Sequence, residues 1–234
     1  TGRLTPKYQI LAATGTAHNI IALTSGTVEN VSLTGGSGTN GGAVLITGPE
    51  ATLRNCRLYS NTASINGGAI YISSTDALVE NCYVYSNSAT ECGGGVAVYS
   101  LNLASPIIRN CLIWTNAAAQ YGGGLCIYGP TDPGGAVQVS ECTVTKNVAA
   151  SDGGGIAFRL PAGGGPDCDV RNTISYFNHV TTPAAGAKTN ILWGTASSST
   201  LNFSLTTTAE SVPPGGSAGA GILDANPAFQ AAAN

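Results

Sequence analysis

Gly67-Gly-Ala-Ile-Tyr-Ile72 opens a unit of sequence that occurs five times between residues 41 and 178. Each copy begins with a glycine pair and a short apolar run, continues to an Asn-Cys pair or a variant of it, and ends with an asparagine. The closing asparagines lie 26, 29, 31 and 31 positions apart: Asn61, Asn87, Asn116, Asn147 and Asn178. A period of this length, which three landmarks keep, is typical of a solenoid and not of a compact domain.

Each copy contains three short segments in which apolar and other residues alternate with a period of two. In the second copy they are Ile70-Tyr-Ile72, Ala77-Leu-Val79 and Cys82-Tyr-Val-Tyr85. No long run has the 3.6-residue spacing of an amphipathic helix. The sequence therefore predicts an all-β fold, a single-stranded parallel β-helix (solenoid) of about seven turns with three short strands per turn. Equivalent residues of successive turns would stack about 4.8 Å apart.

This stacking predicts apolar columns inside the solenoid, because no single turn can bury its own apolar face. The first column contains Val44, Ile70, Val96, Leu125 and Ile156. Its neighbour contains Ile46, Ile72, Val98, Ile127 and Phe158. A third contains Leu58, Val84, Ile113 and Val144.

Two columns of asparagine predict ladders at the corners of the turns. Asparagine tolerates the left-handed backbone of a tight bend, and its amide can hydrogen-bond along a column of like side chains. The first ladder is Asn55, Asn81 and Asn110; the second is Asn61, Asn87, Asn116, Asn147 and Asn178. The residues that immediately precede the first corner position of successive turns form another column. Its first four members alternate in charge and are followed by Ser140 and Arg171: Glu29, Arg54, Glu80 and Arg109. Each exposed pair contributes less than ~1 kcal/mol, so we expect this column to fix the register.

Four of the seven cysteines occupy one interior column: Cys56, Cys82, Cys111 and Cys142. Cysteine acts there as a small hydrophobic residue, and disulfides between neighbouring turns, which an oxidising compartment permits, are the alternative. Cys92, Cys126 and Cys168 lie outside this column. We expect Cys126 to point outward from its strand, and a Cys92–Cys126 bridge stays open. No CxxC motif or His/Cys cluster indicates a metal or other cofactor.

The composition limits the class of partner. Charged residues make up 9% of the chain and the net charge is −3, against about 25% charged residues in an average protein. No basic patch with interleaved aromatic residues indicates a nucleic-acid partner, and no apolar run approaches the ~20 residues of a membrane span. A surface so poor in charge is weakly protected against self-association. We therefore expect an extracellular, assembled or glycosylated protein, with sequons at Asn30 and Asn202.

The repeat predicts one domain over residues 1–234. Residues 1–14 would form an N-terminal arm and first strand, 15–194 the regular coils, and 195–234 an irregular last turn and tail. Both ends of such a solenoid are exposed sheet edges, and neither end of this sequence has an amphipathic capping helix. The alternatives are a capping loop, further domains, or end-to-end stacking of subunits, which generates a filament if it does not close.

Candidate binding or catalytic groups are few. The outward positions of the glycine-led strand are neither acidic nor basic: Leu45, Tyr71, Ala97, Cys126 and Ala157. Asp167 and Asp169, in a glycine-rich segment expected to be a loop, are the candidate pair for Ca²⁺ or catalysis, with turn-stabilising acids as the alternative. Tyr59, Tyr85, Trp114 and Tyr176 form an outward aromatic row, with Thr145 interrupting it. Such a row can bind sugar faces or stabilise the stack and subunit packing.

The repeat resembles the GGA(I/V/L) and (F/L/V/I)xxN repeats of chlamydial polymorphic outer-membrane proteins. The matching segments are Gly41-Gly-Ala-Val44 with Leu58-Tyr-Ser-Asn61, and Gly67-Gly-Ala-Ile70 with Val84-Tyr-Ser-Asn87. More broadly, residues 15–229 are similar to right-handed parallel β-helix repeat proteins of bacterial surfaces, whose closing phrases resemble Asn190–Gly194 and Ile222–Phe229. The resemblance implies a right-handed coil and a surface role.

The same solenoid also carries polysaccharide lyases and hydrolases, so the fold alone does not decide the function. We expect a non-enzymatic, secreted or cell-surface structural protein, a building block of a fibre, filament or adhesin. Head-to-tail self-association is the expected interaction, with glycans or cell-surface molecules as further partners. The alternative is a carbohydrate-binding or polysaccharide-degrading β-helix.

Overall fold

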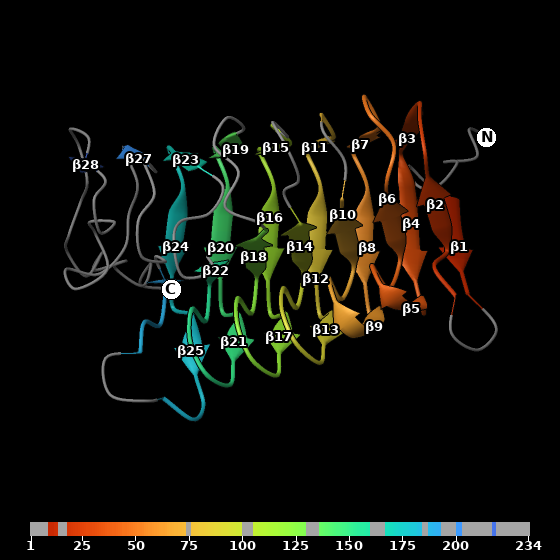
Figure 1. The fold of residues 1–234 in the computed structure, drawn as a ribbon. Helices are drawn as coiled ribbons and strands as arrows, with labels where there is room; N and C mark the ends of the chain where they lie inside the picture. The colour runs from red at the N-terminus through yellow and green to blue at the C-terminus, as the bar shows by residue number, and fades with distance from the viewer. Residues whose placement is uncertain are drawn as a thin grey trace, which may run out of the picture.

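The computed structural model describes residues 9–13, 18–73, 76–99, 105–129, 136–159, 167–183, 187–192, 200–202 and 217–218. Its strands form four parallel sheets around one interior (Figure 1). Sheet A contains β1 (Gln9–Ala12), β4 (Val31–Thr34), β8 (Arg57–Tyr59), β12 (Tyr83–Tyr85), β16 (Leu112–Trp114), β20 (Thr143–Thr145) and β24 (Ile174–Tyr176). Sheet B contains β2 (Ile21–Leu23), β6 (Val44–Ile46), β10 (Ile70–Ile72), β14 (Val96–Tyr99), β18 (Leu125–Tyr128), β22 (Ile156–Arg159) and β26 (Ile191–Leu192).

The other two sheets complete the wall of the solenoid. Sheet C contains β3 (Thr27–Glu29), β7 (Thr52–Arg54), β11 (Leu78–Glu80), β15 (Ile107–Arg109), β19 (Ala136–Ser140), β23 (Asp167–Arg171), β27 (Thr200–Asn202) and β28 (Ser217–Ala218). Sheet D contains β5 (Ser37–Asn40), β9 (Thr62–Asn66), β13 (Ser88–Ala89), β17 (Ala117–Ala118), β21 (Val148–Ala149) and β25 (His179–Val180).

The chain passes through sheets B, C, A and D in that order in every regular coil. This confirms the predicted all-β parallel solenoid. Two details of the prediction were wrong. Each regular coil has four strands and not three, because the segment after the closing asparagine pairs as sheet D. Within the described residues, six consecutive coils have a strand in every sheet, from β2–β5 to β22–β25, which is slightly fewer than the seven turns expected.

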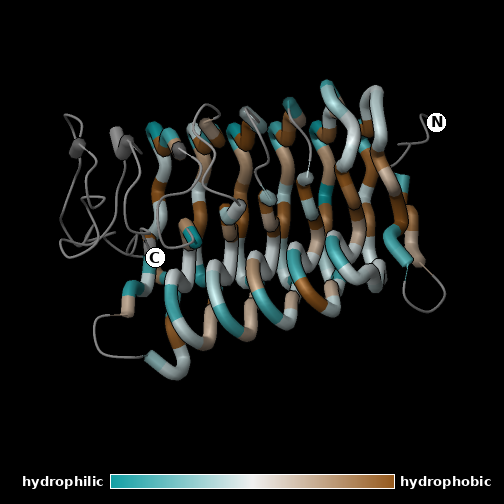
Figure 2. The backbone as a smooth tube through the Cα atoms, viewed as in Figure 1, coloured by the Kyte–Doolittle hydropathy of each residue, from teal (hydrophilic) through white to brown (hydrophobic). Residues whose placement is uncertain are grey.

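The predicted interior columns are confirmed. Ile70 pairs with Val44 on one side and Val96 on the other, and the register continues to Leu125 and Ile156. None of these five side chains has exposed surface. The other two apolar columns are aligned and buried in the same way, and Figure 2 shows hydrophobic positions recurring from coil to coil. The core is therefore one continuous file along the rod, in which each coil covers its neighbour.

The two glycines at the start of each unit are required for two different structural reasons. Gly67 has φ +65°, in the left-handed region that favours glycine. Gly68 lies where the coils approach most closely, and a Cβ there would fall well inside the contact distance of the Gly94 carbonyl oxygen. The first glycine therefore forms the bend and the second permits the coils to stack, which explains why both recur.

The structure describes only part of the two end segments that the sequence predicted, residues 1–14 and 195–234. At the start, β1 pairs with β4 and extends sheet A, so residues 9–12 are a strand of the solenoid. At the other end, β26 extends sheet B, and β27 and β28 extend sheet C. The rest of the predicted arm, most of the predicted irregular turn and tail, and the closing phrase Ile222–Phe229 lie outside the described residues.

Candidate functional site

The outward positions of the glycine-led strand lie on the outer face of sheet B. The register places Leu45, Tyr71, Ala97, Cys126 and Ala157 in one outward row, as predicted. Glycosidase chemistry requires two carboxyl groups about 5 to 10 Å apart, and this row contains none.

The charged column along sheet C is confirmed by the register, which aligns Glu29 with Arg54 and Glu80 with both Arg54 and Arg109. Arg54 donates to Glu29 at 2.6 Å, and Arg109 donates to Glu80 at 2.7 Å. The two arginine side chains are each nearly half exposed. These charges therefore neutralise one another between coils, at the C-terminal ends of the strands of sheet C.

Asp167 and Asp169 were expected in a loop, and this was wrong: both belong to β23. The carboxylate of Asp169 forms an ion pair with Arg171 of the same strand. Nothing is described of the Asp167 side chain, and within the described residues no group of three or more metal-ligating side chains is present. A cation site at this pair stays a prediction.

The second asparagine column forms a buried ladder of hydrogen bonds. Asn87 Nδ2 donates to Asn116 Oδ1 at 3.0 Å and to the Leu58 carbonyl oxygen at 3.0 Å. The backbone N–H of Asn87 also donates to Asn116 Oδ1. The same pattern links Asn61 to Asn87, Asn116 to Asn147 and Asn147 to Asn178, and it ends on Asn190. The amide groups are therefore satisfied inside the rod, and their role is structural.

The two asparagine columns divide the roles that were predicted for both. Asn55, Asn81 and Asn110 have φ between 50° and 55° and so form the left-handed bend themselves. In the second column the left-handed residue is the one before each asparagine: Ser60, Ser86, Thr115, Lys146 and Phe177. A recurring asparagine can thus be selected either for its backbone or for its amide.

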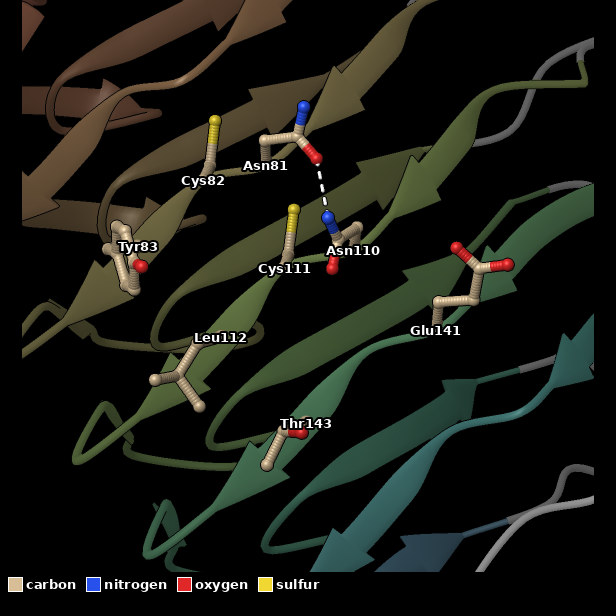
Figure 3. A pocket seen from close by; sticks show the side chains of 8 residues that line it. All are labelled: Asn81, Cys82, Tyr83, Asn110, Cys111, Leu112, Glu141 and Thr143. Atoms are coloured by element: carbon tan, nitrogen blue, oxygen red, sulfur yellow. Dashed lines mark hydrogen bonds between the residues drawn. The ribbon is translucent and has the colours of Figure 1, made fainter.

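The first asparagine corner borders a hollow of about 320 Å³ between sheets C and A (Figure 3). Its lining is Asn81, Cys82, Tyr83, Asn110, Cys111, Leu112, Glu141 and Thr143. Asn110 Nδ2 donates to Asn81 Oδ1 at 2.6 Å across it. The hollow continues the repeat, since Glu141 takes the left-handed position of the asparagines with φ 57°. Glu141 is the one carboxylate of this described lining, so the hollow offers amide contacts and no carboxylate pair.

The interior cysteine column is confirmed. Cys56, Cys82, Cys111 and Cys142 are buried thiols. Each Sγ donates to the carbonyl oxygen two residues earlier at 3.1 to 3.2 Å. The contact with Cys111, followed by burial, raises the pKa of Cys142 well above its usual value. Cys142 is therefore a neutral packing group, and the burial of all four thiols in the core agrees with the first interpretation of the column, a file of small hydrophobic residues.

The aromatic row on sheet A is also confirmed. The rings of Tyr59 and Tyr85 stack at 5.2 Å, and those of Tyr85 and Trp114 at 4.3 Å. Thr145 separates Trp114 from Tyr176 in the register. Tyr59 and Trp114 cover the two faces of the Tyr85 ring. Neither face of this ring is therefore free to stack on a sugar. The geometry therefore agrees with stacking for stability within this part of the row.

Beside the row lies a groove of about 420 Å³ that the sequence did not single out. It is lined by Arg57, Tyr83, Tyr85 and Trp114. Tyr83 is 42% exposed, lies edge-on to Trp114, and has the Arg57 guanidinium 5.8 Å from its ring centre. The signal that could have found it is the position of Arg57 and Tyr83, which pair directly in neighbouring coils.

Cys126 points outward from sheet B, as predicted, but it is not exposed. It forms a second buried cluster with Cys92 and Ala157, against which Tyr121 and Tyr128 pack. Arg159 Nη1 donates to Cys92 Sγ at 3.4 Å, and its guanidinium lies 4.4 Å from the centre of the Tyr121 ring.

The contact with Cys126 and, after the opposing effect of burial, the Arg159 guanidinium lower the pKa of Cys92 to about 7. Burial, followed by the contact with Cys92, raises the pKa of Cys126. The two thiols of this cluster therefore differ in character, and Cys92 is the one that ionises more readily.

Comparison with known proteins gives a single result. A family model described as "Right handed beta helix region" matches residues 10–178. The searches of curated proteins and of solved structures gave no match. In the part of the chain that the structure describes, no helix is long and apolar enough to cross a bilayer.

Proposed function

The chain belongs to the right-handed β-helix family, and we propose that it is a non-enzymatic extracellular building block that stacks end to end with further copies in a surface fibre or adhesin. The proposal is carried by the N-terminal end of the described part of the rod. Within the described residues, β1, β2, β3 and β5 are the terminal strands of their four sheets at this end. Each is hydrogen-bonded to one neighbouring strand only.

The interior columns reach this end and become partly exposed there. Ile21 pairs with Val44, but Val44 has no exposed surface whereas Ile21 is only half-buried. Val28 and Leu53 show the same difference, since Leu53 is fully buried and Val28 is not. These residues have the inward orientation of their columns, and none of the described strands covers them on this side. An apolar end of this kind, bounded by unpaired strand edges, is a template for another strand.

A second copy stacked on this end would supply the strand pairing and the apolar cover that each internal coil receives from its neighbour. Parallel strands about 4.8 Å away would pair with the free edges, and a covering coil would bury Leu11, Ile20 and Ile21, all partly buried against the core. Burying an aliphatic side chain completely stabilises by about 1.5–3 kcal/mol. Because the two ends of a parallel coil differ, the contact is head to tail, and it continues into a filament unless it closes.

Sedimentation velocity over a range of concentrations tests this proposal. We expect assembly that increases with concentration, and Ile21→Lys, which places a charge at the apolar end, to abolish it. The matched control is Thr62→Lys, at an exposed position on the side of the rod. A chain that remains monomeric at every concentration, or that assembles equally well with Ile21→Lys, would contradict end-to-end stacking.

A second candidate function is carbohydrate binding at the groove beside the aromatic row. The observation in its favour is the exposed ring of Tyr83 beside the Arg57 guanidinium, since aromatic faces and charged donors both bind sugars and their acidic groups. Glycan-array binding that is lost in Tyr83→Ala and kept in Ile174→Ala would support it. Ile174 is an exposed side chain of the same sheet, at the equivalent strand position three coils away. The absence of binding to any glycan would remove this candidate.

A further inference from the structure

The cluster of Cys92, Cys126 and Arg159 on the outer face of sheet B has no part in end-to-end stacking. It lies in the middle coils: Cys92 pairs with Tyr121 of the next coil, and Cys126 pairs with Ala97 and Ala157. The two thiols contact each other through their side chains although they come from successive coils. A guanidinium donates to one of them.

We propose that Cys92 and Cys126 form a thiol–disulfide exchange site that reacts with low-molecular-weight disulfides, with Cys92 as the attacking thiol and Cys126 as the resolving thiol. A thiolate is the nucleophile in this reaction, and an adjacent cation favours it. Arg159 supplies that cation at 3.4 Å from Cys92 Sγ, and Glu91 is the charge that opposes it.

The surroundings of the site separate it from the interior cysteines. Cys92 is buried at 1% exposure, but the Arg159 side chain that lies against it is exposed. Tyr121 and Tyr128 also pack against the cluster, and Arg159 is its exposed cover, so access to the sulfur requires Arg159 and the neighbouring rings to move. The interior column lies inside the main apolar core with no cation among the described contacts of its thiols. The same chain therefore contains an internal control, four stacked thiols in contact with one another.

The reaction balances without any further reactant. The Cys92 thiolate attacks one sulfur of the disulfide RSSR, forms a Cys92–SR bond and expels RS⁻, which takes up the proton that Cys92 released. Cys126 then loses its proton and attacks Cys92 Sγ, so that the Cys92–Cys126 bond forms and a second RS⁻ leaves and takes up that proton. Two protein thiols are oxidised and one RSSR is reduced to two RSH.

Incubation of the full chain with oxidised glutathione near neutral pH, followed by non-reducing peptide mapping, tests the proposal. We expect one linked pair of peptides, Cys92 with Cys126, while the interior cysteines remain thiols that can be alkylated after unfolding. The variant Cys126→Ala should accumulate glutathione on Cys92, and Cys92→Ser should form neither product. Both substitutions suit the fold, because Cys126 aligns with Ala97 and Ala157, and Cys92 aligns with the polar side chains of Tyr121 and Asp152.

Arg159→Gln tests the role of the cation. At pH 7, a rise of one unit in the pKa of Cys92 from about 7 lowers its thiolate fraction from about one half to about one tenth, so we expect exchange at that pH to slow about fivefold. The matched control Arg54→Gln removes an arginine of the charged column and should leave the rate unchanged. If circular dichroism shows that Arg159→Gln is not folded, the test is the reaction rate of Cys92 relative to the interior thiols in the wild-type chain. Linkage at other cysteines, Cys92 reacting no faster than the interior thiols, or an unchanged rate in folded Arg159→Gln would overturn the proposal.

Discussion

At the scale of single residues, the asparagine ladder shows how strongly the fold depends on one amide. Asn116 has no exposed surface. Its Nδ2 donates to the Val84 carbonyl oxygen and to Asn147 Oδ1, and its Oδ1 accepts from the backbone and side-chain amides of Asn87. Removing this side chain would leave its four partner groups in the interior, each without one hydrogen bond.

We therefore predict that Asn116→Ala lowers the free energy of unfolding by about 3–5 kcal/mol, because each buried polar group left unsatisfied costs about 1–3 kcal/mol. Denaturant unfolding measures the change. The control is Asn110→Ala, at an exposed left-handed corner with φ 50°. There the cost is that of a left-handed alanine, about 1–2 kcal/mol, together with the loss of the exposed hydrogen bond from Asn110 Nδ2 to Asn81 Oδ1, and we expect the total to stay below that of the buried amide. Equal losses in the two variants would contradict the division of roles between the two asparagine columns.

The two classes of cysteine give a second prediction at this scale. The lowered pKa of Cys92, about 7, means that its thiolate forms as the pH rises through that value. The rate of alkylation of Cys92 by iodoacetamide should therefore rise between about pH 6 and 8 and then level off.

The raised pKa of Cys142, which its contact with Cys111 and its burial cause, implies no reaction over the same range. Rates from quenched labelling and peptide mass spectrometry at several pH values measure both sites. A Cys92 profile that keeps rising beyond pH 9 would show an unactivated thiol.

At the scale of the strand, alternation in the sequence predicted three sheets correctly and missed the fourth. Val44–Ile46 and Ile70–Ile72 alternate between buried and half-buried side chains, which is a readable pattern. Strands of sheet D such as β13 (Ser88–Ala89) are two residues long and contain small side chains, so they carry no periodic signal. They pair because the neighbouring strands already hold the coils in register.

The same limit explains Cys126. Its outward direction follows from alternation within β18, but its burial depends on Tyr121, which lies outside the named strands, and on Tyr128 at the far end of the same strand. Contacts of this kind depend on how the loops cross the face of a sheet, and a strand pattern does not contain that information. The candidate thiol site was therefore only half predictable.

The charged column provides a prediction for whole strands. Ser140 of β19 lies in register between Arg109 of β15 and Arg171 of β23. We predict that Ser140→Glu continues the alternation of charge and raises the free energy of unfolding by about 0.5 kcal/mol, a gain that 1 M salt removes.

Ser140→Lys, which places a third positive charge in sequence, should destabilise the chain by a similar amount at low salt. Denaturant midpoints of both variants at low and high salt measure the effect. Equal stabilities would show that the column contributes nothing to the register.

At the scale of the whole molecule, the described coils share one interior and differ in what covers it. An internal coil has a neighbour on each side, and its inward-facing apolar residues are buried, whereas the first described coil keeps Ile20, Ile21 and Val28 partly exposed. The repeat period predicted this rod, since it required every coil to rest on another. The repeat period does not predict which molecules bind to the outside of the rod, because the outward positions can vary without changing the interior.

Cryo-electron microscopy of the assembled protein tests end-to-end stacking most directly. We expect filaments one rod wide, in which the ~4.8 Å spacing of the coils continues without interruption across each boundary between subunits. The coil of β2 and β3 would meet the opposite end of the next copy. Dispersed single rods at high concentration, or rods associated side by side through sheet A or sheet B, would contradict it.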